Sequence, residues 1–251
     1  MKIAILTGAS SGLGREYLRL LAAREELDQI WAIARREERL RELCALSPEK
    51  IVPLAWDLCA PGTMEALSGK LADERPEVEI LINNAGVGSV GEFIEMSPES
   101  QRKICELNVT ALTEATNRIL PFMGKGGCVV NVCSIAAFAP NTRMAVYCSS
   151  KAYVQSFSKC LRRELKGRGI HVMAVCPGPM NTEFFEASDA VGRSVPLESG
   201  LPRCCPKRVA ERSLSRALRG KGFYTPRFFY KLYRLLAKLL PHSFIMNFSG
   251  T

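Results

Sequence analysis

The chain has 251 residues, of which 47% are hydrophobic and 24% are charged. This length and composition predict one large globular domain, or one domain with a small appendage. No apolar run approaches the roughly eighteen residues of a membrane-spanning helix, and the start of the chain lacks the pattern of a signal peptide. We therefore expect a cytoplasmic protein.

The ten cysteines are scattered along the chain, and no Cys-x-x-Cys pair occurs among them. In a chain without an export signal they predict a reducing compartment, and their spacing predicts no zinc or other metal site. Cys204 and Cys205 are adjacent and lie near basic residues, which leaves open whether they are reactive.

Apolar runs alternate with helical patterns along most of the chain. The runs that predict strands are residues 3–7, 30–34, 51–56, 78–82, 127–133, 170–176 and 223–225. The first helical pattern ends near residue 25, and the others cover residues 37–46, 62–74, 98–122, 145–166 and 206–219. Continuous apolar strands separated by helices predict an α/β fold with a parallel sheet covered on both faces. Ligands of such sheets bind beyond the carboxyl ends of the strands.

Two stretches near the C-terminus depart from this alternation. Residues 187–206 mix small, polar and proline residues, which predicts a substrate loop over the active site, either mobile or formed of short helices. Residues 226–251 form a basic extension to the domain of residues 1–225, and a helix is expected over 227–240.

A glycine-rich turn follows the first predicted strand and opens a helix. Its glycines are Gly8, Gly12 and Gly14, a spacing that lets the backbone approach a pyrophosphate at a helix N-terminus. The second strand ends at Arg35 and Arg36, where an acid would hold the ribose 2′-hydroxyl of NAD. Two guanidinium groups suit a 2′-phosphate instead, so the sequence favours NADP(H) over NAD(H).

Tyr147 and Lys151 are four residues apart, which on a helix places both side chains on one face. An ammonium group stabilises an ionised phenol, and such a phenol can exchange a proton with an alcohol oxygen. Ser134 follows a predicted strand and can reach the same oxygen if that strand neighbours the helix. By themselves, Tyr147 and Lys151 favour a surface pair on an amphipathic helix, and the rest of the chain has to decide between the two interpretations.

The complete motif series resembles that of the short-chain dehydrogenase/reductase family. The matching residues are Thr7 to Gly14, Asn83 to Gly86, Asn108, Ser134, Tyr147, Lys151, Pro177 and Gly178. The resemblance covers residues 1–182 and implies a single-domain Rossmann fold with a doubly wound sheet of about seven strands. It also implies a homodimer or homotetramer that interconverts alcohols and carbonyls with NAD(P).

The resemblance implies a role for each matching residue. Tyr147 is expected to be the general acid/base, Lys151 to lower its pKa and bind the nicotinamide ribose, and Ser134 to bind the substrate oxygen. Asn108 is expected to support a proton relay from Lys151. The residues expected to bind the cofactor are Gly8, Ser10, Ser11, Gly12, Leu13, Gly14, Arg35, Arg36, Asp57, Leu58, Asn84, Ala85, Gly86, Tyr147, Lys151, Pro177, Gly178 and Thr182. Cys133 departs from the family, in which a serine is common at that position.

The C-terminal fifth of the chain is strongly basic. Residues 202–251 hold 11 of the 34 Lys and Arg residues and one of the 25 acidic residues. On the helix 227–240, Lys231, Arg234 and Lys238 form one stripe. The opposing face is apolar and consists of Phe228, Phe229, Leu232, Leu235, Leu236, Leu239 and Leu240. This face is expected to pack on the domain or a partner subunit; the alternatives are an anionic membrane surface and a cap over a hydrophobic substrate. Nucleic-acid binding is not expected, because the aromatic residues form no open stacking platform.

These features predict an NADPH-preferring enzyme that interconverts a secondary alcohol and a ketone. The expected substrate is hydrophobic, of the steroid, bile acid or fatty acyl type. The alternative is a non-catalytic NADP(H)-binding sensor or scaffold protein, although such a protein would not need Ser134, Tyr147 and Lys151 together.

Overall fold

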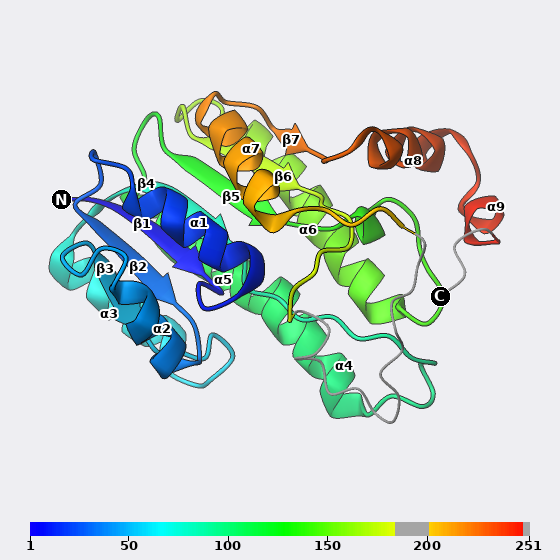
Figure 1. Cartoon of the computed structure of the whole chain (residues 1–251), viewed down its shortest axis with the longest axis horizontal. Coiled ribbons are helices and arrows are strands. Elements are labelled where there is room, and N and C mark those ends of the chain that lie inside the picture. The colour runs from blue at the N-terminus through cyan, green and yellow to red at the C-terminus, as the bar shows by residue number, and fades with distance from the viewer. Residues whose placement is uncertain (184–200, 248–251) are drawn as a thin grey trace.

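The computed structural model describes residues 1–183 and 201–247. Its centre is a parallel sheet of seven strands in the order β3-β2-β1-β4-β5-β6-β7 (Figure 1). The strands are β1 (Lys2–Thr7), β2 (Gln29–Ile33), β3 (Ile51–Leu54), β4 (Glu77–Asn83), β5 (Cys128–Val132), β6 (His171–Val175) and β7 (Phe223–Tyr224). This order is that of a doubly wound Rossmann fold, as the family resemblance implies, and the parallel sheet is the one that the alternating pattern predicts.

The register brings the predicted motifs to one edge of the sheet. Thr7, at the end of β1, pairs with Ile33 of β2 on one side and with Asn83 of β4 on the other. Val132, at the end of β5, pairs with Val175 of β6. The segments that follow these strands therefore lie side by side, at the place where such sheets bind ligands.

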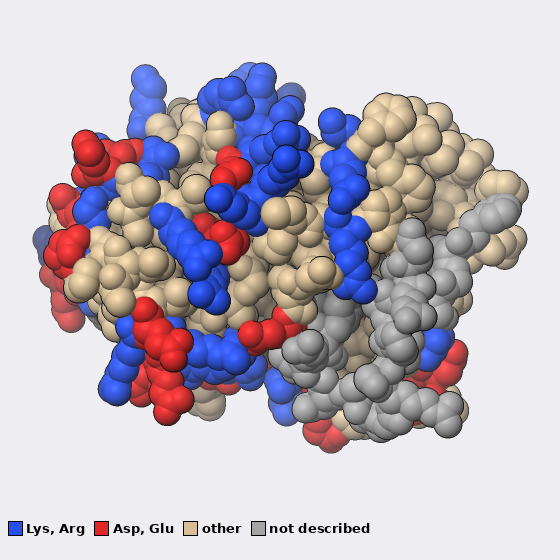
Figure 2. Space-filling model, in the orientation of Figure 1, with Lys and Arg blue, Asp and Glu red and all other residues tan. Residues whose placement is uncertain are grey.

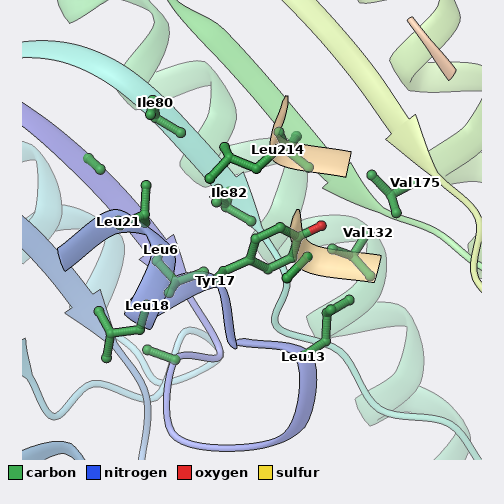
Figure 3. Close-up of a cluster of buried hydrophobic side chains, with 14 of the residues drawn as sticks. Leu6, Leu13, Tyr17, Leu18, Leu21, Ile80, Ile82, Val132, Val175 and Leu214 are labelled. Atoms are coloured by element: carbon green, nitrogen blue, oxygen red, sulfur yellow. The ribbon is translucent and has the colours of Figure 1, made fainter. Parts of the chain in front are cut away.

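Helices cover both faces of the sheet. One face carries α1 (Gly12–Ala22), α2 (Glu37–Cys44) and α7 (Pro206–Leu218), and the other carries α3 (Thr63–Glu74), α5 (Leu112–Ile119) and α6 (Ala145–Glu164). On the first face the Tyr17 ring is fully buried among side chains from α1, α7 and the strands (Figure 3). Its hydroxyl lies 2.6 Å from the Ser213 hydroxyl, which satisfies both polar groups and ties α1 to α7.

The long helical region predicted over 98–122 is divided into four parts. They are α4 (Pro98–Cys105), a π-helical turn η1 (Glu106–Ala111), α5 and a 3-10 turn η2 (Leu120–Phe122). A second 3-10 turn, η3 (Ile135–Ala137), follows β5. The π-helical turn contains Asn108, and π-helical turns are common at functional sites.

Two helices end the described chain, α8 (Phe228–Leu239) and α9 (His242–Met246), and they extend from one end of the body (Figure 1). Among residues 1–183 and 201–247, no helix has both the length and the hydropathy needed to cross a membrane. Most of the predicted substrate loop, residues 187–200, lies outside the described residues.

Candidate active site

The glycine-rich turn after β1 is closely packed against the start of α1. Gly8 and Gly12 adopt φ values of 68° and 52°, which disfavour a residue with a side chain. A Cβ atom on Gly14 would lie 2.0 Å from the Gly8 carbonyl oxygen. The predicted spacing of three glycines therefore has a steric cause at each position.

The segment after β4 holds this turn in place. The Asn84 side-chain amide donates hydrogen bonds to the carbonyl oxygens of Thr7 and Gly8, at 3.1 and 2.9 Å. The Thr7 hydroxyl accepts hydrogen bonds from the backbone amides of Asn84 and Ala85, both at 3.0 Å. Asn84 thus supports the shape of the turn.

The two arginines after β2 have different neighbours. The Arg35 guanidinium lies 3.9 Å from the Asp57 carboxylate, whereas Arg36 lies 2.7 Å from the Glu183 carboxylate and donates to the Ser10 hydroxyl at 3.4 Å. Arg39 also pairs with Glu183, and hydrogen bonds from these two arginines hold the pKa of the Glu183 carboxyl below its usual value. Sequence reasoning missed Glu183, because nothing in its local sequence indicates that it reaches the end of β2.

Tyr147 and Lys151 lie on α6, one turn apart, and both are buried. The Lys151 ammonium donates a hydrogen bond to the Val132 carbonyl oxygen at 3.1 Å and lies 5.8 Å from the centre of the Tyr147 ring. Ser134 follows β5 directly, and its hydroxyl accepts a hydrogen bond from the Ala136 amide at 3.1 Å. The structure therefore brings Ser134, Tyr147 and Lys151 together, and the surface interpretation of the pair is wrong.

Burial shapes the protonation of both groups on α6. Burial raises the pKa of the Tyr147 phenol, and a hydrogen bond with Ser134 acts in the opposite direction. Burial lowers the pKa of the Lys151 ammonium. The effect expected of Lys151 on the pKa of Tyr147 stays a prediction.

Asn108 connects the segment after β4 to α6, next to the site. Its fully buried side chain accepts a hydrogen bond from the Val87 amide at 2.9 Å and donates to the Val87 carbonyl at 2.8 Å. It also donates to the Ser150 hydroxyl on α6 at 3.0 Å. A Cβ atom on Gly86 would lie 3.0 Å from the Asn108 amide oxygen and 3.3 Å from the Lys151 nitrogen. Asn108 therefore fixes the β4 segment against α6, and its expected part in a proton relay stays a prediction.

One cavity of about 990 Å³ joins these groups. The predicted site residues that line it are Gly8, Ser10, Ser11, Gly12, Leu13, Arg35, Arg36, Asp57, Leu58, Asn84, Ala85, Gly86, Ser134, Tyr147, Lys151, Pro177, Gly178 and Thr182. Gly14 and Asn108 lie behind the wall of the cavity.

The far end of the cavity is apolar and belongs to the C-terminal helices. Its lining residues there, which sequence reasoning did not assign to the site, are Phe229, Tyr230, Tyr233, Leu236, Leu240, Phe244 and Ile245. The fully buried Tyr230 ring packs on Gly178, where an added Cβ atom would lie 2.3 Å from the ring. Its hydroxyl donates to the Pro202 carbonyl oxygen at 2.6 Å. Gly178 thus leaves room for α8 to dock beside the site.

The orientation of α8 differs from the expected one. The face toward the body contains Tyr230, Ala237 and Arg234, whose guanidinium lies 3.5 Å from the centre of the Phe223 ring. Phe228 and Leu239 point outward and are 79% and 71% exposed, so their packing on the domain is excluded. Figure 2 shows mostly uncharged surface over α8 and α9 in this view, at the right of the molecule.

Residues 2–191 match the family model of the short chain dehydrogenases. The chain belongs to this family. It is 34% identical, over 198 residues, to a short chain dehydrogenase of the fungus Pseudocercospora fijiensis, and the match covers 76% of this chain. The chain spans 63% of that relative and 31% of the mycobacterial oxidoreductases that it also matches.

Two solved structures share the fold over nearly the whole chain. A short-chain dehydrogenase from Sphingobium yanoikuyae in complex with NADPH is 28% identical and superposes with a TM-score of 0.80, covering 98% of this chain and 96% of that one. A bulky-bulky ketone specific alcohol dehydrogenase from Comamonas testosteroni is 25% identical, with a TM-score of 0.77 and coverages of 98% and 94%. The Sphingobium structure contains NADPH, a nicotinamide cofactor.

The residues of the short chain dehydrogenase site fit such a cofactor. The turn at Gly8 and Gly12 presents backbone at the start of α1, where a pyrophosphate is favoured by amide groups and the helix dipole. Arg35 and Asp57 line the cavity where the adenosine half would lie, and Lys151 lines it near Tyr147. A Cβ atom at Gly14 or Gly86 would obstruct this arrangement.

Proposed function

We propose that this protein is an NADP(H)-dependent oxidoreductase that interconverts a secondary alcohol and a ketone on a hydrophobic substrate. The observation that carries the proposal is the single cavity that runs from the glycine turn, past Ser134 and Tyr147, to the apolar end formed by α8 and α9. A substrate at that end would have its reacting oxygen near the Tyr147 hydroxyl.

The chain's own residues supply a proton and an orientation. The raised pKa of Tyr147 keeps its phenol protonated at neutral pH, which suits donation to the oxygen of a ketone undergoing reduction. Ser134 is placed to hydrogen-bond that same oxygen, and the Lys151 ammonium would hold the nicotinamide ribose beside it. The bound cofactor would supply the hydride.

The two arginines at the end of β2 support a preference for NADPH. Arg36 already binds an anionic group, the Glu183 carboxylate, at 2.7 Å, and Arg35 lies beside it along the cavity. A 2′-phosphate carries more charge than a carboxylate and accepts bidentate hydrogen bonds from guanidinium groups. The NADPH complex of the Sphingobium relative is consistent with this preference.

The substrate end supports a bulky, apolar substrate of the steroid, bile acid or fatty acyl type. Six side chains of α8 and α9 line it, together with Leu240 between the two helices, and all of them are aromatic or aliphatic. Burial of apolar substrate surface against such a wall provides most of the binding free energy. The bulky-bulky ketone specific alcohol dehydrogenase from Comamonas testosteroni supports a bulky ketone as the substrate.

The test is NADPH oxidation across a panel of steroid and acyl ketones, with the wild type and Tyr147→Phe. The variant should lose at least about 100-fold in kcat because the proton donor is removed, and should lose only a few-fold in NADPH affinity because many other residues line the cofactor end. Tyr153→Phe is the matched control, since Tyr153 lies on the same helix and its hydroxyl contacts Thr113 outside the cavity. Turnover that survives in Tyr147→Phe would refute the mechanism.

The outward apolar ridge of α8 supports a reversible contact with a membrane surface, from which an apolar substrate could enter. Phe228, Leu235 and Leu239 are exposed along it, and Lys231 and Lys238 flank it. The double variant Phe228→Ser/Leu239→Ser should lose cosedimentation with phosphatidylcholine/phosphatidylglycerol vesicles, whereas Leu46→Ser, at another exposed apolar site, should not. Equal partition of all three proteins would contradict this contact. The expected homodimer or homotetramer stays a prediction.

A further inference from the structure

A second cavity, of about 380 Å³, lies between α7 and the segment that joins β7 to α8. It shares no lining residue with the active-site cavity. Basic side chains gather over α7 and along the segment that leads into α8 (Figure 2). Five cations line the cavity: Arg212, Arg216, Arg219, Arg227 and Lys231.

The positive charge in this cavity is poorly compensated. Glu211 is the one acidic residue in the lining. Among the described residues, none of the five cations forms an ion pair with an acidic side chain. Like charges gathered around one hollow repel each other, so the arrangement favours an anion between them.

Several of these groups are held in place by the fold. The Arg216 guanidinium lies 5.6 Å from the centre of the Tyr224 ring, and the Arg219 Nε donates to the Ser215 carbonyl oxygen at 3.1 Å. Arg227 adopts a φ of 57°, in the left-handed region, and donates to the Arg203 carbonyl oxygen. Preorganised guanidinium groups lose less freedom when they bind an anion than mobile ones do.

Thr225 gives an independent indication of a ligand. It lines the cavity and is 4% exposed, and its hydroxyl is buried without a hydrogen-bond partner among the described residues. A buried hydroxyl with no partner is costly, and native structures rarely retain one without a reason. The N-terminus of α8 adds to this indication, because Arg227 provides no side-chain cap and the first turn contains no acid.

We propose that this second cavity binds a phosphate group, carried either by a small soluble phosphate compound or by the head of an anionic lipid. Phosphate suits the cavity because arginines bind it with paired hydrogen bonds and a hydroxyl can donate a further one. The position of the cavity at the start of α8 places a bound phosphate next to the helix that walls the substrate end. The site is separate from the proposed catalytic function and does not depend on it.

The test is isothermal titration calorimetry of the full chain with inorganic pyrophosphate. The wild type should bind it, and Arg212→Gln/Arg216→Gln should weaken binding by at least about tenfold, because two charge-assisted contacts are lost. Arg208→Gln is the matched control, since Arg208 is exposed on the same helix and lies outside the cavity lining. Pyrophosphate must also bind when NADPH saturates the protein and occupies the glycine turn, which excludes the active-site cavity as the location.

Thr225→Val tests whether the Thr225 hydroxyl contacts the bound anion, because this substitution leaves the charge of the cavity unchanged. Valine has nearly the same shape and no hydroxyl, so the variant should fold normally and still lose several-fold in pyrophosphate affinity. The site would be refuted if pyrophosphate affinity fell equally in Arg208→Gln and in Arg212→Gln/Arg216→Gln. Full pyrophosphate affinity in Thr225→Val would also refute it.

A second experiment distinguishes a lipid headgroup from a soluble phosphate compound. Vesicles of phosphatidylcholine with phosphatidic acid replace pyrophosphate, and pelleting of the wild type is compared with that of Arg212→Gln/Arg216→Gln. Binding of the vesicles that needs these arginines would indicate a lipid headgroup, and binding of pyrophosphate alone would indicate a soluble ligand. Binding of neither probe would refute the proposal.

Discussion

The two ends of the main cavity are built in different ways. At the cofactor end, the lining residues follow β1, β2, β3 and β4 directly, and the register of the sheet alone brings them together. At the substrate end, the wall comes from α8 and α9, which dock beside the sheet through Tyr230 on Gly178. The first end is fixed by backbone geometry and the second by side-chain packing.

This difference predicts how each end responds to mutation. At Gly8 and Gly14 an added Cβ atom meets backbone atoms, which cannot yield, so small changes should have large effects. On α8 most side chains are exposed, so only the few that contact the body should affect stability.

The largest effect is expected for Gly14→Ala. The added Cβ atom would lie 2.0 Å from the Gly8 carbonyl oxygen, so the turn must move away from α1. We expect a loss of about 3 kcal/mol or more in the free energy of unfolding, together with loss of cofactor binding. Urea unfolding and NADPH titration measure these two effects.

Gly69→Ala is the control for that substitution. Gly69 lies inside α3, and an added Cβ atom would meet nothing within 4 Å. The variant should gain about 0.5–1 kcal/mol, because glycine is a poor helix former. Equal effects of the two substitutions would show that the turn does not depend on close backbone contact.

The cofactor end could largely be predicted from the sequence. Apolar runs indicate the strands, each motif follows a strand, and parallel strands bring their ends together. Ser134 reaches the site for this reason, and Tyr147 and Lys151 meet it from α6, whose Lys151 bonds to the end of β5. The role of Glu183 could not be predicted, because its contact with Arg36 depends on the path of the chain after β6.

The substrate end could not be predicted in the same way. Helical periodicity shows that α8 has two different faces, but it does not show which of them packs on the body. The apolar face is expected to pack on the domain or a partner subunit, whereas the helix buries Tyr230 and Ala237 and places Arg234 over the Phe223 ring. The π-helical turn at Asn108 has no signature in the residue pattern either, and the partners of Asn108, Val87 and Ser150, are distant in the sequence.

A second prediction tests the orientation of α8 by comparing Tyr230→Ala with Phe228→Ala. Tyr230 is fully buried and bonded to the Pro202 carbonyl oxygen, so its truncation should cost about 3 kcal/mol. Phe228 is 79% exposed, and its truncation should change the free energy of unfolding by less than about 0.5 kcal/mol. Urea unfolding measures both values. The reverse order would mean that α8 packs through its apolar ridge.

A third prediction concerns the choice of cofactor. Arg36→Gln should weaken NADPH binding by about tenfold, because a charge-assisted contact to the 2′-phosphate is lost, and should leave NADH binding unchanged. Arg41→Gln is the control, since Arg41 lies on the same segment but pairs with Glu37 outside the cavity. Fluorescence titration with both cofactors measures the difference. An equal loss of affinity for NADPH and NADH would show that Arg36 does not recognise the 2′-phosphate.

The smallest effect is expected at Glu183, whose carboxylate occupies Arg36 and Arg39. Glu183→Gln should tighten NADPH binding by about threefold, because the arginines then have no competing carboxylate. The pKa of Glu183 is lowered in the fold, so its ion pairs stabilise the protein above the unfolded carboxyl pKa, and this contribution disappears as the pH falls through the folded pKa.

Thermal unfolding of the wild type and Glu183→Gln should therefore differ slightly at pH 7 and converge in acid. The difference should also shrink at high salt, since these groups are close to half exposed. A gap in Tm that persists below the folded pKa of Glu183 would mean that Glu183 acts through packing. In that case the carboxylate would not compete with the 2′-phosphate, and the cofactor preference would rest on Arg35 and Arg36 alone.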